Sequence, residues 1–274
     1  MKRSELPPPF TFAAYAVLCS VIAASDLVPL RVVDALCEAP EGGFIVLRYD
    51  VDARPAHALR MAQLLHGHSL RGTFYWHAHP AALFRVDVMR QIAALGHEIG
   101  YHYATLEACG GDLDAAAAMF CREVARFHDA GFDVQTAAAH GSRHVSNLAL
   151  LKQRPDLLDA CGLLGEAYLS VDFSRVQYIS DAGWAWRQYP LRADAQEYRA
   201  RYGASALRRL HDADLLALLA RPGPPLYLNT HPELWFDSGW QARLLRWRRA
   251  IGSRVLAWEP IWWAYQTFKR RGRR

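Results

Sequence analysis

Short apolar runs alternate with stretches of helical periodicity along most of the chain. Strands are predicted at 43–52, 71–78, 97–102, 134–140, 166–173, 176–180 and 225–231. Helices are predicted at 54–67, 87–96, 113–131 and about 206–220. Gly96 is placed to end the second of these helices, and Asp112 to cap the third. Repeated strand–helix units favour a parallel α/β sheet, either barrel-like or doubly wound.

The size and composition of the chain favour one domain. It has 274 residues, of which 52% are hydrophobic, enough to bury one large core. We find no repeat, low-complexity region or linker that would divide it. We therefore expect a single domain over residues 1–274.

The N-terminus allows two interpretations. The segment MKRSELPPPFTFAAYAVLCSVIAAS has two basic residues followed by a short apolar stretch, as a secretory signal does. Against that stand Glu5, three prolines, and Thr11, which is placed to cap a buried helix over 12–24. These local features favour a retained helix over a signal peptide.

The cysteines favour a reducing compartment. There are five, an odd number, scattered through the chain without a CxxC pair. This pattern argues against a disulfide framework and against a structural zinc site. We therefore expect a cytoplasmic protein.

The basic excess lies at the C-terminal end. From Gln241 onward the chain carries ten basic residues and one acidic residue, whereas the remainder has a net charge of −4. A tail at about 259–274 joins aromatic residues to a lysine and arginine cluster, which suits an anionic membrane surface at the inner face. The alternative is a packed final helix with a frayed basic end. We expect no nucleic-acid partner, because the rest of the chain shows no basic face.

Residues able to bind metals recur where the predicted strands end. They are Asp50, Asp52, His77, His79, His102, His140 and His231. In a parallel barrel the carboxyl ends of all strands meet on one face, so these side chains would converge. A single histidine is more often structural, but carboxylates with imidazoles form a ligand set for zinc or a similar divalent ion. Their shared position predicts a metal centre.

Five segments, in this order and spacing, resemble the polysaccharide deacetylase superfamily (NodB homology, carbohydrate esterase 4), and most of all its WbmS-like branch from O-antigen gene clusters. They are VLRYDVD, GTFYWHA, GHEIGYHYATL, AAHGS and LNTHPE, and GLLGEAYLSVDFS also has the look of this branch. The resemblance extends from about residue 10 to residue 231. It implies a distorted (β/α) barrel of about seven strands, a retained N-terminal helix, and metal-assisted hydrolysis of an N-acyl group on a sugar.

The resemblance also implies catalytic roles. The Asp-x-Asp motif makes Asp50 the general base and Asp52 a metal ligand, because one carboxylate must stay on the metal while the other takes a proton from water. His231 matches the general acid that protonates the departing amine. The alternatives are an Asx turn for the two aspartates and a core or capping role for His231.

The second motif departs from the family pattern of two metal-binding histidines four residues apart. Alignment through GHEIG places His102 at the position of the first ligand and Leu106 at that of the second. His97 then has a structural role or supports a ligand without binding the metal itself. We expect His140 to replace the missing ligand, with Glu107 or His77 behind it. Otherwise the metal is weak or absent.

Four further residues are candidates for contacts with the sugar. Glu166, Asp172 and Asp181 lie near the ends of later strands and would bind hydroxyl groups or orient His231. Tyr103 would stack on a sugar ring, although aromatic residues of this kind usually belong to the core or its lid.

The resemblance thus implies a metal-dependent hydrolase, with zinc as the first choice of metal. It would remove an N-acetyl or similar N-acyl group from an amino sugar, free or lipid-linked, during the synthesis of O-antigen or another surface polysaccharide. A deformylase or other amidohydrolase of the same fold stays open. So does a non-catalytic carbohydrate-binding protein on this fold, which Leu106 favours.

Overall fold

The computed structural model describes residues 6–38, 40–142, 145–190, 207–221, 223–245 and 247. The basic aromatic tail at about 259–274 lies outside the described residues. The helices are α1 (Phe12–Ala23), α2 (Val32–Glu38), α3 (Pro55–Gly67), α4 (Val86–Ala94), α5 (Thr105–Ala108), α6 (Leu113–Asp129), α7 (Leu148–Gln153), α8 (Asp156–Ala160), α10 (Asp212–Leu219) and the 3-10 helix η3 (Pro232–Leu234). The strands are β1 (Val28–Leu30), β2 (Phe44–Val51), β3 (Thr73–Trp76), β4 (Glu98–Tyr103), β5 (Thr136–Ala139), β6 (Gly165–Glu166), β7 (Gln177–Ser180), β8 (Trp186–Gln188), β9 (Arg208–Leu210) and β10 (Leu226–Thr230).

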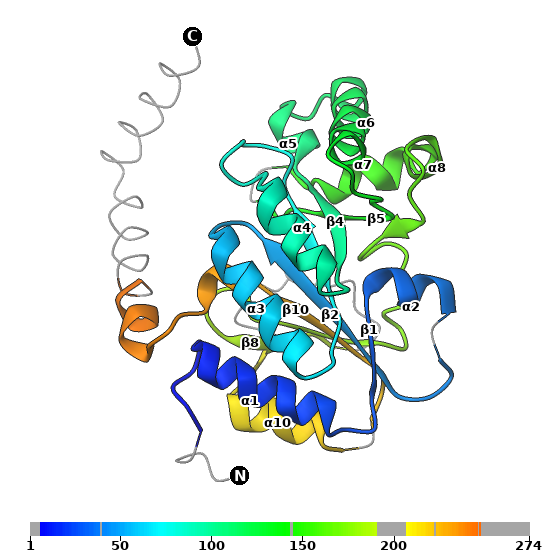
Figure 1. Cartoon of the computed structure of the whole chain (residues 1–274). Helices are drawn as coiled ribbons and strands as arrows, with labels where there is room; N and C mark the ends of the chain where they lie inside the picture. Colours follow the sequence, from blue (N-terminus) through cyan, green and yellow to red (C-terminus); the bar gives the residue numbers. More distant parts are fainter. Residues whose placement is uncertain are drawn as a thin grey trace, which may run out of the picture.

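The strands form one large mixed sheet in an α/β fold. Its order is β6-β5-β4-β3-β2-β10-β7-β8-β9, and β1 pairs with the first part of β2. All pairings from β6 along the sheet to β7 are parallel. Strand β8 pairs antiparallel with both β7 and β9. Figure 1 shows β2 and β10 side by side in the middle of the molecule, with α3 and α4 along one side.

The sheet of ten described strands is open, so the expected distorted (β/α) barrel of about seven strands is not confirmed. The break follows β6, where a strand was predicted over 166–173 and the chain instead turns. The carboxylate of Glu166 accepts hydrogen bonds from the backbone N–H groups of Tyr168 and Leu169, each at 2.7 Å. These bonds bend the backbone. Strand β6 therefore ends after two residues and does not pair with β7.

The sheet nevertheless curls around a small interior cluster of its own. Buried side chains from β2, β3, β5 and β10 pack together there, separately from the main core. The hydroxyl of Tyr227, on β10, donates to the carbonyl of Ala167, just after β6, at 2.8 Å. This side-chain bond crosses the interior from β10, in the middle of the sheet, to the turn after the end strand β6. Gly100 on β4 makes room for the interior ring of Tyr75, since a Cβ there would lie 2.3 Å from that ring.

The predicted N-terminal segment forms α1, which packs on the outside of the sheet. Thr11 caps it, accepting a hydrogen bond from the N–H of Ala14 at 3.1 Å. The helix lies beside α3 and α10 (Figure 1). The hydroxyl groups of Tyr15, on α1, and Tyr49, on β2, are 2.6 Å apart in the core. This bond joins the first helix to the strand that carries Asp50.

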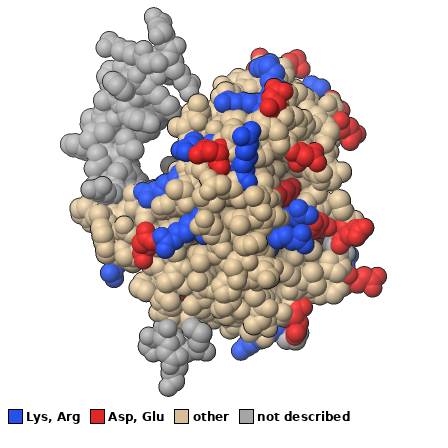
Figure 2. Space-filling view, in the orientation of Figure 1, with Lys and Arg blue, Asp and Glu red and all other residues tan. Residues whose placement is uncertain are grey.

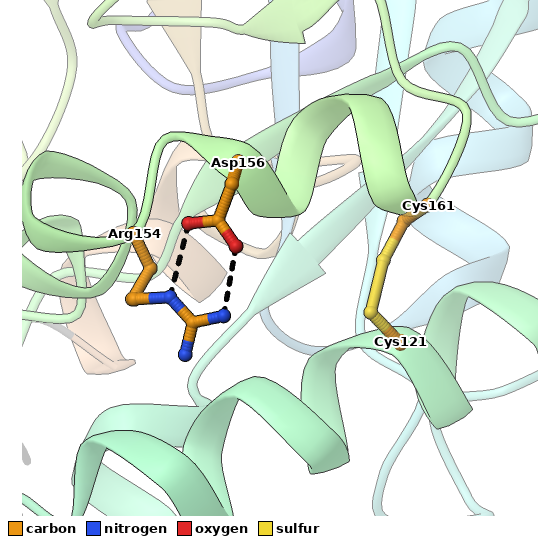
Figure 3. The surroundings of a disulfide bond; sticks show 4 residues. All are labelled: Cys121, Arg154, Asp156 and Cys161. Carbon is orange, nitrogen blue, oxygen red and sulfur yellow. Dashed lines mark hydrogen bonds and ion pairs between the residues drawn. A yellow bond between two sulfur atoms is a disulfide. The ribbon is translucent and has the colours of Figure 1, made fainter.

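A disulfide joins two helices, contrary to the expectation from the cysteine pattern. Cys121 of α6 is bonded to Cys161, directly after α8 (Figure 3). The cysteine pattern could not predict this bond, because the two cysteines are 40 residues apart and are brought together only by helix packing. Nearby, Arg154 makes a two-bond ion pair with Asp156 on the surface.

The described surface carries both signs of charge. On the face shown in Figure 2, Lys and Arg are interspersed with Asp and Glu over a largely uncharged surface. In the part of the chain that the structure describes, no helix is both long enough and apolar enough to cross a membrane.

Candidate metal and acid–base site

The parallel strands bring the candidate residues to one edge of the sheet. Each residue of the set lies at the carboxyl end of a strand or directly after it: Asp50 and Asp52 (β2), His77 (β3), His102 (β4), His140 (β5), Asp181 (β7) and His231 (β10). In the register of the sheet, Asp50 is opposite Tyr75 and His102 is opposite Ala138. The sequence predicted this convergence from strand ends for all of these residues except Asp181, but it also included His79, which is exposed and lies 3.7 Å from Glu123 instead.

Three histidines surround Asp52. Its Oδ1 atom lies 3.2 Å from the Nε2 atom of His102 and 3.3 Å from that of His77. Its Oδ2 atom lies 3.8 Å from the Nε2 atom of His140. One ligand atom each of Asp52, His77 and His140 fall within 4.8 Å of one another. The three imidazole rings are adjacent, with centroids 4.7 to 5.4 Å apart.

The protonation of this group suits a cation. Burial raises the pKa of Asp52, but the hydrogen bonds from His102 and His77 outweigh it, so its pKa lies well below the ordinary value. Burial lowers the pKa of His77, which favours the neutral ring that binds metals. The Nδ1 atom of His102 is 2.9 Å from the carbonyl oxygen of Ala138, which can only accept, so this bond places the proton on Nδ1. The Nε2 atom of the same ring faces Asp52.

These residues fit a divalent metal ion. A carboxylate and imidazole nitrogens are suitable ligands for zinc and neighbouring ions, and a backbone carbonyl behind a histidine is the usual support of a metal ligand. Among the described residues, the buried Nδ1 atom of His140 has no hydrogen-bond partner.

Asp50 is held by an arginine on its own strand. Arg48 donates from Nε to Oδ1 at 2.7 Å and from Nη2 to Oδ2 at 2.9 Å, and Asn229 donates to Oδ2 at 3.1 Å. Burial raises the pKa of Asp50, but the charge of Arg48, helped by His102 and His231, outweighs it and lowers that pKa to about 2. Asp50 is therefore ionised throughout the physiological pH range.

His231 is held by Asp181. The Nδ1 atom of His231 lies 2.7 Å from Oδ1 of Asp181, and its backbone N–H donates to the same carboxylate. The indole N–H of Trp235 donates to Oδ2 at 2.9 Å. Burial lowers the pKa of His231, but the hydrogen bond and charge of Asp181 outweigh it and raise that pKa to about 10. The Nε2 atom of His231 lies 3.9 Å from Oδ2 of Asp50.

Three residues predicted to contact the sugar have other positions. Tyr103 is fully buried between Tyr101 and Phe120 in the core, so it cannot stack on a ligand. Glu166 is fully buried, and its carboxylate accepts from backbone N–H groups, including that of Ala139 at 2.8 Å. It therefore ties β5 to the turn after β6. Asp172 is exposed and accepts from the N–H of Ser174.

Two residues of the second motif, His97 and Leu106, lie away from Asp52. His97 lies at the start of β4, where it contacts the backbone of Ala62 and Gly72. Its pKa is lowered by burial to about 4. It is thus a structural histidine, a strand length away from His102. Leu106 lies on α5, 4% exposed, within the main core cluster.

Sequence reasoning missed two residues near the site. Arg48 shares a strand face with Asp50, two positions away, and a charged residue inside an apolar strand is a signal that could have found it. Glu233 gave no such signal. Its Oε2 atom is buried without a partner among the described residues, and burial, together with the charges of Asp52 and Asp181, raises its pKa to about 7 although His231 opposes this.

The fold and the site together define an α/β protein with a histidine and carboxylate centre at the carboxyl edge of a parallel sheet. No family model and no curated protein matches the sequence. Two solved structures are similar in fold: the wild type and a mutant of a CE4 family pseudoenzyme from Bacillus anthracis. Each has 13% sequence identity and a TM-score of 0.44. The alignments cover 78% of this chain and 62% and 64% of the two solved chains, so this chain spans less than two thirds of their length.

Proposed function

We propose that this protein is a metal-dependent hydrolase that removes an N-acetyl or similar N-acyl group from an amino sugar. The observation that carries the proposal is the pair formed by Asp50 and His231. Their environments move the two pKa values in opposite directions, to about 2 and about 10, while the side chains stay 3.9 Å apart beside Asp52. At neutral pH the carboxylate is therefore ionised and the imidazole protonated, which are the starting states of a general base and a general acid in amide hydrolysis.

The roles follow from the contacts. Asp50, fixed by Arg48 and Asn229, takes the proton of the attacking water. His231, fixed by Asp181, gives its Nε2 proton to the departing nitrogen, because an amide anion is a very poor leaving group. Asp52 and His102, with His140 as a further ligand, would hold a divalent cation, with zinc as our first choice. When bound, such a cation would polarise the acyl carbonyl and make the attacking water more acidic.

The proposed substrate and cellular setting rest on the sequence resemblance. The motifs similar to the WbmS-like branch support an amino sugar of O-antigen or another surface polysaccharide, free or lipid-linked. We further propose that the protein works in the cytoplasm, although the Cys121–Cys161 disulfide removes the cysteine argument for that setting, and that its basic tail contacts the anionic inner face of the membrane. Deleting the residues after Trp258 should reduce co-sedimentation with anionic vesicles, and unchanged co-sedimentation would disprove the tail's role.

The main test combines metal content with turnover. Elemental analysis of the purified protein should find about one metal ion per chain, and this metal should be lost in Asp52→Ala and His102→Ala. The metal-loaded protein should release acetate from N-acetylated amino sugars. Asp50→Asn and His231→Gln should abolish that release while keeping the metal. His79→Ala is the matched control, because His79 is an exposed histidine beside the site.

One observation favours a second function. Leu106 stands where the related family has a metal ligand, so a carbohydrate-binding protein without activity is the alternative. It requires that the wild-type protein bind an N-acetylated amino sugar, contain no metal even after incubation with zinc, and release no acetate. Near-stoichiometric metal in the wild type would exclude this form of the alternative.

A further inference from the structure

The three histidines around Asp52 are held with different firmness. The side chain of His102 is 1% exposed and anchored on the carbonyl of Ala138. That of His77 is 10% exposed and lies 3.3 Å from Asp52. That of His140 is 31% exposed, and its Nε2 atom is the farthest from Asp52, at 3.8 Å.

A second difference concerns the ring nitrogen that points away from Asp52. A metal-binding histidine is normally oriented by a hydrogen bond from its other nitrogen. His102 has this bond to Ala138, whereas the Nδ1 atom of His140 is buried without a partner among the described residues. Only the backbone of His140 is fixed, by its N–H on the carbonyl of Tyr103 and by its own carbonyl, which accepts from Asn147. The ring thus lacks the hydrogen bond from Nδ1 that would fix its orientation, and within the described part of the chain only its contacts with His77, His102 and Asp52 position it.

Four protein ligands are one too many for catalysis. Zinc sites closed by four protein ligands are structural, whereas catalytic sites have three and leave a position for water or substrate. Ligand atoms of Asp52, His77 and His140 lie within 4.8 Å of one another; His102 is outside that group, but its Nε2 atom is 3.2 Å from Asp52, and its binding would make four ligands and close the site. One of the four must give way before a carbonyl can bind, and the least anchored and most exposed of them is His140.

We propose that His77 takes the ligand position that Leu106 does not fill, and that His140 is an exchangeable ligand that leaves the cation when the substrate carbonyl binds. The inference rests on the proposed function and divides the ligands of the same cation. The exchange breaks one bond from the cation to a histidine nitrogen and forms one to a carbonyl oxygen. It needs no oxidant, reductant or proton.

The experiment measures Co²⁺ affinity and the absorption spectrum of bound Co²⁺ in the full chain. The variants are His77→Asn, His102→Asn and His140→Asn, with His79→Asn as the control two residues from His77. Losing a fixed ligand should weaken affinity by more than the roughly 100-fold that loss of an outer partner costs at most. We expect this in the first two variants, and a loss of less than about 10-fold in His140→Asn.

Acetate, used as a carbonyl-side probe, tests the exchange directly. In the wild-type protein, acetate must displace His140 from the cation, whereas in His140→Asn it displaces only water. The acetate concentration that half-saturates the change in the Co²⁺ spectrum should therefore be lower in His140→Asn than in the wild type. Far-UV circular dichroism checks folding, and His77→Gln replaces His77→Asn if that variant is misfolded.

Each outcome decides the inference. If His140→Asn loses Co²⁺ as completely as His77→Asn, or if His77→Asn binds like the wild type, our division of the ligands is wrong and the proposed hydrolase survives. An equal or higher half-saturating acetate concentration in His140→Asn would disprove the exchange. If the wild type binds no Co²⁺ at all, both the inference and the metal-dependent function fail.

Discussion

Replacing Asp181 by asparagine removes the charge that faces His231 while keeping the size of the side chain. Asp181 is fully buried, and three donors converge on it: the backbone N–H and ring of His231, and the indole of Trp235. The variant therefore leaves an imidazolium without its partner in a buried site. Removing one member of such a pair typically costs about 3–5 kcal/mol of folding free energy.

The structure gives an independent magnitude. The pKa of His231 is raised from 6.5 to about 10 against the effect of burial, chiefly by Asp181, with Asp50 and Asp52 adding to it. At about 1.4 kcal/mol per pKa unit, this rise corresponds to roughly 5 kcal/mol in favour of the charged ring. Because the folded pKa is the higher one, this stabilisation is fully present below pH 6.5 and is lost as the pH rises through about 10. The gap between the wild type and Asp181→Asn should thus be largest near pH 6 and shrink toward pH 10.

Urea unfolding followed by circular dichroism, with a chelator present, measures this gap at several pH values. An NMR titration of the His231 ring should show its pKa falling in the variant. Asp172→Asn is the matched control, since Asp172 is exposed and accepts only a local backbone N–H, that of Ser174. A gap below about 1 kcal/mol at pH 6, or one that widens as the pH rises, would refute the reasoning.

Three other predictions follow from single contacts. Arg48→Met leaves Asp50 buried without its arginine, which should cost about 3–5 kcal/mol near pH 7. The exposed pair in Figure 3, tested by Arg154→Met, should cost far less in the same urea titration although its two-bond geometry is alike. The pKa of Asp50 is lowered from 3.8 to about 2 in the folded protein, so its contribution to wild-type stability is present above pH 3.8 and is lost as the pH falls through about 2. Arg48→Met should therefore reduce the fall in unfolding free energy over this acidic range. Replacing both Cys121 and Cys161 by alanine should lower the free energy of unfolding by about 4 kcal/mol, which is the loop-closure value for a crosslink across 40 residues. An unchanged urea midpoint under oxidising conditions would contradict the crosslink. Leu106→His buries a polar group in the core and should destabilise the protein by about 1–3 kcal/mol without raising its metal content; a gain in metal measured by elemental analysis would show that this position still faces the site.

Where the sequence predicted the fold correctly, the residues decided the structure locally. The apolar runs that became β2, β3, β4, β5 and β10 are short, buried and bounded by turns, so periodicity was enough. The run over 166–173 has the same look but folds as a turn, because the carboxylate of Glu166 binds the backbone of Tyr168 and Leu169. A side chain that competes for backbone donors is invisible to an apolar pattern.

The site was predictable as a place but not as a set of contacts. The rule that parallel strands end together located Asp50, Asp52 and His231 without any contact being known. It could not rank His77 against His140, because both follow strands, and the side-chain direction in a loop is set by packing. The disulfide between Cys121 and Cys161 was missed for a similar reason, since it depends on how α6 meets α8.

The position of Leu106 shows how far a missing motif residue can be used as evidence. A leucine in place of a ligand suggests a decayed site as long as the motif is read along the chain. In the folded protein, however, the ligand position is a point at the edge of a sheet, and every strand that ends there can supply a side chain to it. His77, after β3, and His140, after β5, reach Asp52 from two other strands of the same sheet, while Leu106 packs into the core. The loss of a motif residue therefore argues for lost activity only when no neighbouring strand end offers a replacement.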